Sequence, residues 1–244
     1  MAAKKKSQRI VEITLNRSGN LQKITLEIVI DCSGDGDVSA MAGADFELSP
    51  LSKRQLAGFT IHVKGLKDYD ETLPIKVPYY LSQATEQKLL PAYLKFTAFA
   101  QGESSDDGFC KINIPSENSR RKQLVLKRAE RALRYLADKL PTFKDAYIIE
   151  TSLRVLNREG RRICGEYTLT EDDVLNARKF DDGVVKNSWP IELWDKNKGT
   201  IYKYVKPGNY YEIPFRCLKV KGINNLLTAG RCISATREAL GSTR

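Results

Sequence analysis

Two segments near the ends of the sequence could bring the peptide backbone close to a ligand. Each is an apolar run that leads into glycine: residues 28–30 lead into Gly34, and residues 225–229 lead into Gly230. In nucleotide-binding α/β folds, ligands lie beyond the carboxyl ends of strands, and glycine there lets the backbone approach a phosphate or a ring without a Cβ clash. Either segment alone favours a tight turn, so the prediction of a ligand site depends on the two occurring together.

Three arginines form a second candidate set: Arg158, Arg161 and Arg162. A guanidinium group binds carboxylate or phosphate in a planar, bidentate manner and keeps its charge at ordinary pH. These side chains predict binding of an anionic substrate. The alternative is a strand edge with solvated or salt-bridged arginines, because a strand sends Arg161 and Arg162 to opposite faces. At most one or two of the three are then ligands.

Several separated blocks of the sequence, read in order, resemble one family. Residues 30–38 read IDCSGDGDV and are followed by AGA at 42–44. Further blocks are REGRRICGEYTLTEDDV at 158–174, YEIPFRCL at 211–218 and NLLTAGRCISATREALGS at 225–242. Together they resemble the FAD-dependent oxidoreductase family whose flavin domain is of the glutathione-reductase type.

This resemblance implies a cofactor, a reaction and two sets of contacts. The implied cofactor is FAD, and the implied reaction is hydride transfer between FAD and a small, possibly anionic substrate bound by an inserted domain. The residues implied to lie beside the nucleotide portion of FAD are Ser33, Gly34, Asp35 and Gly36. The residues implied to line its phosphate and ribityl region are Ala229, Gly230 and Arg231.

The sequence departs from the family at two positions where members carry histidine. Trp194 and Arg237 stand there instead. The single histidine, His62, lies in an alternating pattern typical of a strand, and we interpret it as structural. A histidine acid–base role is therefore unsupported. The candidates that remain for proton donation or substrate clamping are Arg162, Tyr167 and Arg237, although packing explains the tyrosine equally well.

The elements that must position these residues follow from apolar periodicity and turn chemistry. Residues 9–15 and 21–30 predict a β-hairpin. Residues 119–140 predict the clearest helix of the chain, because apolar residues recur at roughly helical spacing: Leu124, Leu126, Ala129, Leu133, Leu136 and Leu140. Thr170 and the three acidic residues after it predict a helix N-terminus. Other expected elements are a short helix at 38–42, a helix at 82–99 broken near Pro91, and strands at 58–63, 109–114, 146–156, 184–193, 200–205, 210–218 and 225–229.

These elements predict a mixed α/β fold of the α+β class. We expect residues 1–45 and 210–244 to form a partial FAD-binding domain, and residues 46–209 to form an inserted substrate domain with a mixed sheet and helices. The motif G-x-G-x-x-G, whose βαβ unit receives the pyrophosphate, occurs nowhere in the sequence. We therefore expect a chain truncated at both ends, whose hairpin and final strand have unpaired edges.

The missing motif leaves two readings of the function open. In the first, the chain is part of an enzyme but binds FAD weakly or not at all when alone, and associates through its open edges. In the second, it is a non-catalytic remnant or a subunit, which completes its flavin site with a complementing N-terminal flavin-domain chain or in a homo-oligomer.

The composition of the chain indicates which classes of binding partner to expect. The chain has 244 residues, 41% of them hydrophobic, enough for a buried core in one or two domains. Its net charge of +10 favours anionic partners, but no aromatic residues interleave with the basic stretch at 120–134, so nucleic acid is not expected. Five cysteines without a C-x-x-C pair predict no metal site. Without a signal sequence or an apolar run of about 18 residues, a cytoplasmic protein with no membrane partner is expected.

Overall fold

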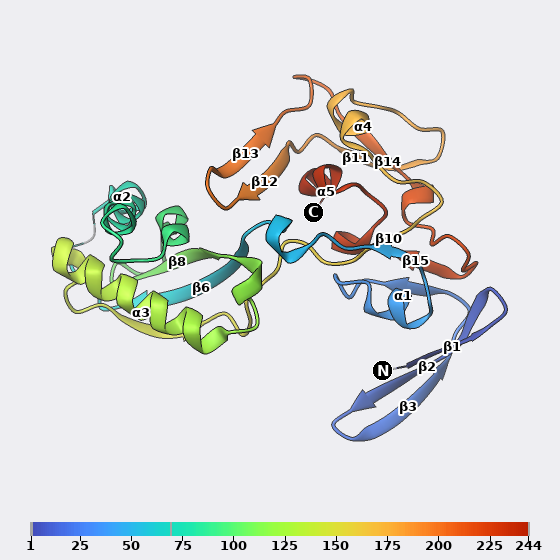
Figure 1. Ribbon diagram of the computed structural model, residues 1–244, viewed down its shortest axis with the longest axis horizontal. Coiled ribbons are helices and arrows are strands. Elements are labelled where there is room, and N and C mark those ends of the chain that lie inside the picture. Colours follow the sequence, from blue (N-terminus) through green and yellow to red (C-terminus); the bar gives the residue numbers. More distant parts are fainter. Residues whose placement is uncertain (1, 69, 244) are drawn as a thin grey trace. The chain divides into compact units, whose positions relative to one another are not determined.

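The computed structural model describes residues 2–68 and 70–243, and it has a mixed α/β fold (Figure 1). Its α-helices are α1 (Asp37–Met41), α2 (Leu73–Glu86), α3 (Lys122–Lys139), α4 (Glu171–Leu175) and α5 (Arg237–Thr243). Its strands are β1 (Ala2–Lys6), β2 (Arg9–Arg17), β3 (Asn20–Thr25), β4 (Val29–Asp31), β5 (Phe46–Glu47), β6 (Ala57–Lys64), β7 (Ala98–Gln101), β8 (Asp107–Ile114), β9 (Tyr147–Thr151), β10 (Arg162–Ile163), β11 (Gly183–Asn187), β12 (Ile191–Asp195), β13 (Gly199–Lys203), β14 (Tyr211–Pro214) and β15 (Leu226–Thr228). Over the described residues, no helix combines the length and the apolar character that a membrane crossing needs.

The chain divides into two compact units, and each is described by itself. Unit 1 comprises residues 1–50, 159–193 and 200–244, and unit 2 comprises residues 51–158 and 194–199. This division differs from the predicted boundaries after residues 45 and 209. The reason is a shared core, because Leu169 and Ile191 are buried in the same cluster as Leu240. The assignment of the units to FAD and to substrate stays a prediction.

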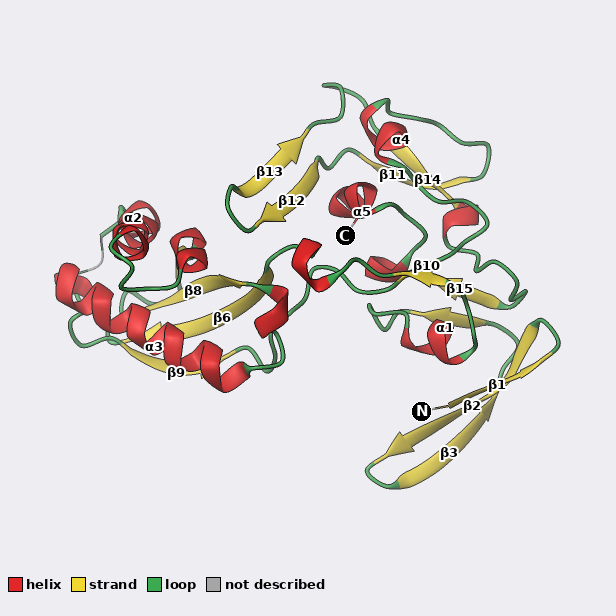
Figure 2. Cartoon of the chain, viewed as in Figure 1, coloured by secondary structure: helices red, strands yellow, loops and turns green. Residues whose placement is uncertain are grey.

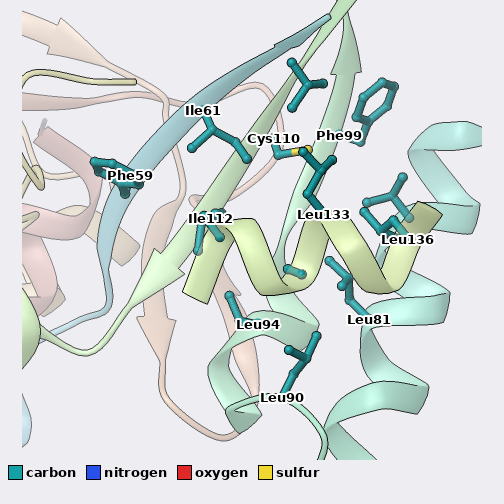
Figure 3. Packing of buried hydrophobic residues seen from close by; sticks show 14 of the residues in the cluster. Phe59, Ile61, Leu81, Leu90, Leu94, Phe99, Cys110, Ile112, Leu133 and Leu136 are labelled. Atoms are coloured by element: carbon teal, nitrogen blue, oxygen red, sulfur yellow. The ribbon is translucent and has the colours of Figure 1, made fainter. Parts of the chain in front are cut away.

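Unit 2 is an antiparallel sheet covered on one face by two helices. The strand order is β7-β8-β6-β9, and α2 and α3 lie against the sheet (Figure 2). The strands predicted at 58–63 and 109–114 are confirmed as β6 and β8. Side chains from the sheet and from both helices point toward one another, as Figure 3 shows for Ile61 on β6, Leu81 on α2 and Leu136 on α3.

The predicted helix at 119–140 is confirmed as α3, with a different buried stripe. The residues of α3 that are buried are Val125, Ala129, Ala132, Leu133 and Leu136. The predicted stripe included Leu124 and Leu126, which are only half-buried. The spacing of these buried residues is that of one helix face, so α3 packs on the sheet through one apolar face.

The helix predicted at 82–99 was placed wrongly. The helix α2 begins nine residues earlier, at Leu73, and ends at Glu86, and a 3₁₀ segment replaces the predicted second half. Two prolines lie within α2. Pro74 occupies the first turn, where no N–H is needed. Pro78 lies inside the helix, where burial of Val77 and Leu81 outweighs the lost hydrogen bond.

In unit 1, the predicted hairpin is confirmed as β2 and β3, with β1 as a third antiparallel strand (Figure 1). Ser18 and Gly19 form its turn, with φ of 51° and 91°, as a two-residue turn with left-handed residues requires. The lysine-rich β1 carries no apolar alternation, so the sequence pattern could not identify it. Beyond β3 the expected second strand is interrupted, and residues 29–31 form the separate β4.

The strands β4 and β15 form a two-stranded parallel sheet. Leu226 pairs with Val29, Leu227 with Ile30, and Thr228 with Asp31. The final strand has no open edge, contrary to expectation. On its other side, the Thr228 N–H donates to the Leu218 carbonyl at 2.8 Å. The free edge of this sheet is therefore that of β4.

The loop after β4 is organised by the buried carboxylate of Asp31. Its Oδ1 accepts hydrogen bonds from the N–H (3.0 Å) and hydroxyl (2.7 Å) of Ser33, and its Oδ2 accepts from the N–H (2.8 Å) and hydroxyl (2.7 Å) of Ser39. Burial acts to raise the pKa of Asp31, but these hydrogen bonds outweigh it and lower the pKa below 3.8. One ionised side chain thus joins β4, the loop and α1.

Truncation of the α3 stripe tests the core of unit 2. We expect Leu136→Ala to reduce the unfolding free energy by about 2–5 kcal/mol, because the buried side chain leaves a cavity. The measurement is urea denaturation, with Lys127→Ala on the exposed side of the same helix as the control, expected within about 0.5 kcal/mol of wild type. Equal effects of the two substitutions would contradict the packing described.

Asp31→Asn tests the carboxylate that organises the loop. The amide cannot accept all four hydrogen bonds, so we expect a loss of about 2–4 kcal/mol near neutral pH. Because folding lowers the pKa of Asp31, its contribution is complete above pH 3.8 and is lost as the pH falls through the folded-state value. The difference between wild type and variant should therefore shrink in acid. Glu12→Gln, which removes a surface ion pair to Lys23, is the control and should cost at most about 1 kcal/mol. A pH-independent difference for Asp31→Asn would refute the charge argument.

Candidate functional site

The two glycine junctions predicted from the sequence lie side by side in unit 1. Because β4 and β15 run parallel, the loops that follow them leave the sheet at the same end of the two strands. The Ala229 N–H donates to the Asp31 carbonyl at 3.0 Å. Gly34 and Gly230 both have left-handed backbones, with φ of 79° and 81°. The seven residues predicted to bind the cofactor therefore lie on two adjacent loops. We call these the Gly34 loop (residues 33–36) and the Gly230 loop (residues 229–231).

Arg231 joins the two loops. Its Nη2 lies 3.6 Å from Oδ1 of Asp35. The same guanidinium covers Gly34, where a Cβ atom would lie 2.7 Å from Nη2. Glycine at position 34 thus allows the arginine of one loop to reach across the backbone of the other.

A third segment, residues 159–161, closes the opposite side of the Gly34 loop. Nη1 of Arg161 donates to the Asp35 carbonyl at 2.6 Å and to Oδ1 of Asp37 at 2.9 Å. A Cβ atom at Gly160 would lie 2.1 Å from Oδ1 and 3.2 Å from Cα of Asp35, so a side chain there would require Asp35 to move. Arg161 and Arg231 therefore both contact Asp35 of the Gly34 loop.

The arrangement suits a ligand that carries phosphate or hydroxyl groups. A Cβ atom at Gly230 would meet no other atom within 4 Å, so its backbone is open to close approach. Arg161 and Arg231 are each about one-third exposed, and together they bring two fixed positive charges to the junction. The thiol of the adjacent Cys232 is not a nucleophile, because burial raises its pKa to about 11.

Two of the arginines predicted to bind substrate have other contacts. Arg158 belongs to unit 2, where it donates to the Leu56 carbonyl and to Oδ1 of Asn113 (3.0 Å) and stacks over the Trp194 ring at 4.2 Å. Arg162 is buried on β10, and it donates to Ser49 (3.1 Å) and Glu47 (3.2 Å). The three arginines do not form one cluster of contacts. Their predicted role toward substrate stays a prediction.

Arg237 and Tyr167, which the sequence named as catalytic candidates, also form hydrogen bonds within the protein. Nε of Arg237 donates to the buried Glu159 at 3.1 Å. The Tyr167 hydroxyl donates to Oδ2 of Asp173 at 2.8 Å, and burial followed by this bond raises its pKa. The helix N-terminus predicted at Thr170 is confirmed as the start of α4, where Thr170 and Asp173 form a capping box. No structural observation selects a proton donor among the candidates.

Sequence reasoning missed two residues that build the junction: Asp31 and Gly160. A signal for Asp31 was present, because an aspartate two residues before a serine is typical of a side chain that caps its own turn. No local signal marks Gly160, since the close approach that excludes a side chain involves Asp35, which is distant in the sequence.

A cavity of about 580 Å³ lies at the other end of the same two strands. Its lining includes Ile28, Asn225 and Leu227, which lie at the start of β4 and β15, and also Phe215. The glycine loops do not contribute to its lining. The cavity is therefore a feature of the sheet, separate from the predicted cofactor-contacting residues.

Comparisons with solved structures found distant neighbours. One is a geranylgeranyl bacteriochlorophyll reductase-like protein from Thermoplasma acidophilum, with 10% sequence identity and a TM-score of 0.39 over 69% of this chain and 36% of that one. Another is a triple mutant of the flavin-dependent brominase Bmp2, with 17% identity and a TM-score of 0.37 over 68% of this chain and 40% of that one. The match thus spans well under half the length of either neighbour. No curated protein matched.

The match to a family model is more extensive. The model described as FAD dependent oxidoreductase matches residues 1–244. The resemblance of the separated sequence blocks to this family is therefore confirmed, and with it the expectation of FAD as the cofactor. The chain belongs to the FAD-dependent oxidoreductase family.

Proposed function

We propose that this chain supplies part of the FAD site of an oxidoreductase with a flavin domain of the glutathione-reductase type. The Gly34 and Gly230 loops would contact the cofactor. The observation that carries the proposal is the parallel pairing of β4 with β15, which brings the two predicted loops to one edge of a sheet. The two loops that the sequence predicted separately both follow the carboxyl ends of these strands, where ligands bind in α/β folds.

The residues present fit a phosphate-bearing cofactor in two respects. The backbone of Gly230 is open to a ligand, and the guanidinium of the next residue, Arg231, lies over Gly34 on the adjacent loop. In our proposal, the Gly34 loop lies beside the nucleotide portion, and the Gly230 loop lines the phosphate and ribityl region. FAD, when bound, supplies the hydride acceptor or donor, and the protein positions it.

We propose a small, possibly anionic molecule as the substrate. The support comes from Arg161, whose side chain is 30% exposed while it holds the Gly34 loop. Arg162 offers less support, because its side chain is only 8% exposed and already contacts Glu47 and Ser49. Arg161 is therefore our first candidate for a substrate contact.

We further propose that a βαβ unit with a G-x-G-x-x-G motif completes the site, either from a complementing chain or from a larger assembly. Parallel sheets in proteins are normally covered on both faces. Here one face of the β4–β15 pair carries the exposed Ile28 (65%) and Ile30 (58%), and β4 has a free edge. A further parallel strand with its helix would pair with this edge and cover these side chains.

A second candidate function is a non-catalytic subunit. The observation that favours it is the absence of G-x-G-x-x-G from the 244 residues. The two candidates differ in one measurable property: only the enzyme transfers hydride once a complementing chain and FAD are present.

We propose a cytoplasmic location. All five cysteines are free, and three of them are buried. This pattern is typical of reducing compartments.

Substitution of Gly230 tests the cofactor site. Gly230→Ala places a methyl group in the open space of the Gly230 loop, so we expect FAD binding to weaken at least about tenfold, equivalent to ~1.4 kcal/mol. Gly222→Ala is a matched control, because Gly222 also has a positive φ (76°) and open space around its Cβ position. Equilibrium dialysis against FAD measures weak binding directly. Equal effects of the two substitutions would show that backbone strain, rather than cofactor contact, explains the loss.

The state of the purified chain tests the need for a partner. We expect FAD to be lost on desalting, because the missing motif would supply most of the pyrophosphate contacts. The measurement is the absorption spectrum between about 350 and 500 nm, the range in which flavins absorb, before and after desalting. A stable yellow protein with one FAD per chain would contradict the need for a complementing unit, while leaving the Gly230 experiment valid.

A further inference from the structure

The second face of the sheet in unit 2 carries a polar pocket that the proposed function does not use. Because side chains alternate along a strand, Ile61 points into the core under α2 and α3, and His62 points to the opposite face. On the neighbouring β8, Cys110 faces the core and Phe109 lies opposite His62 in the register. Both strands can be followed in Figure 1.

The imidazole of His62 is held by an ionised carboxylate. Its Nε2 lies 2.6 Å from Oδ2 of Asp107. Oδ1 of Asp107 accepts from both the N–H and the hydroxyl of Ser104, each at 2.8 Å. The hydrogen bond to His62, followed by those from Ser104, lowers the pKa of Asp107 to about 2. Because that carboxylate is ionised, Nε2 must donate to it.

This hydrogen bond fixes the tautomer of the neutral imidazole. The proton lies on Nε2, so Nδ1 is a hydrogen-bond acceptor. Within the described part of the chain, Nδ1 of His62 has no hydrogen-bond partner. A histidine oriented by a carboxylate, with its second nitrogen available, is the arrangement that general bases use. The sequence alone favoured a structural role for His62, whereas its contact with Asp107 favours a role in binding.

The pocket beside this histidine has a volume of about 340 Å³ and a distinct chemistry. Its lining residues include Thr60, Thr151, Ser152 and Glu150, and no lysine or arginine belongs to its lining. The hydroxyl of Ser152 accepts a hydrogen bond from the Thr60 N–H at 3.1 Å. The apolar wall of the pocket is Phe109, whose ring stacks on His62 with centroids 4.2 Å apart, together with the exposed Leu153.

We propose that this pocket binds a small uncharged molecule that has an apolar ring and a hydroxyl group. The hydroxyl donates to Nδ1 of His62, and the ring packs against Phe109. A carboxylate or phosphate ligand is disfavoured, because Glu150 would repel it and no cation of the lining compensates. The inference depends on unit 2 alone, so it stands whether or not the chain binds FAD.

The experiment uses the full chain and two ring compounds that differ in charge: benzyl alcohol and benzoate. His62 is the only histidine in the sequence, so its imidazole gives a single, assignable pair of proton NMR signals. We expect benzyl alcohol to shift these signals saturably, with the millimolar affinity that about eight heavy atoms allow. Benzoate should bind at least about fivefold more weakly, because Glu150 repels its carboxylate.

Calorimetry of two variants completes the test. His62→Gln should weaken benzyl alcohol binding about fivefold or more, because the accepting nitrogen is lost. Lys64→Gln, two residues along the same face of β6 and outside the pocket lining, should leave binding unchanged. The absence of a saturable shift with benzyl alcohol, equal binding of benzoate, or unchanged binding by His62→Gln would overturn the proposal. The wild-type NMR titration decides the question even if His62→Gln does not fold.

Discussion

The parallel pairing of two three-residue strands, β4 and β15, is the constraint on which the rest of unit 1 depends. A two-stranded sheet of this length is not stable alone, so other contacts must hold it. The buried amide of Asn225 exchanges two hydrogen bonds with the backbone of Ile10, 215 residues away. Val29, Leu226 and Ile10 share one buried cluster. The hairpin at the start of the chain thus stabilises the sheet that positions both glycine loops.

Charge at the junction is nearly balanced, and this bears on how a ligand could bind. Arg231 contacts the carboxylate of Asp35 in the Gly34 loop, and Arg161 contacts that of Asp37 at the start of α1. An incoming phosphate would therefore compete with Asp35 for Arg231 rather than enter an empty anion site. The ion pair between them is loose, at 3.6 Å, and its partners are 31% and 48% exposed. Such a pair is weak in water and can be exchanged at little cost.

The sequence predicted correctly those elements that depend on residues close together in the chain. The β-hairpin around Gly19, the helix N-terminus at Thr170 and the presence of the helix α3 were all predicted, because each depends on neighbouring residues. The α2 boundaries were not, since packing overrides the usual meaning of Pro78. For the site, the sequence identified both glycine loops, but not the segment that closes them or the buried position of Arg162. Those depend on contacts between segments that only the folded chain brings together.

The central claim is that the two glycine loops contact one flavin. The most direct measurement is a ¹⁵N-resolved NMR titration of the chain with FAD, following the backbone amides of Gly34 and Gly230. The account predicts that both signals shift and saturate with the same dissociation constant. A response of only one amide, or different dissociation constants for the two, would contradict it.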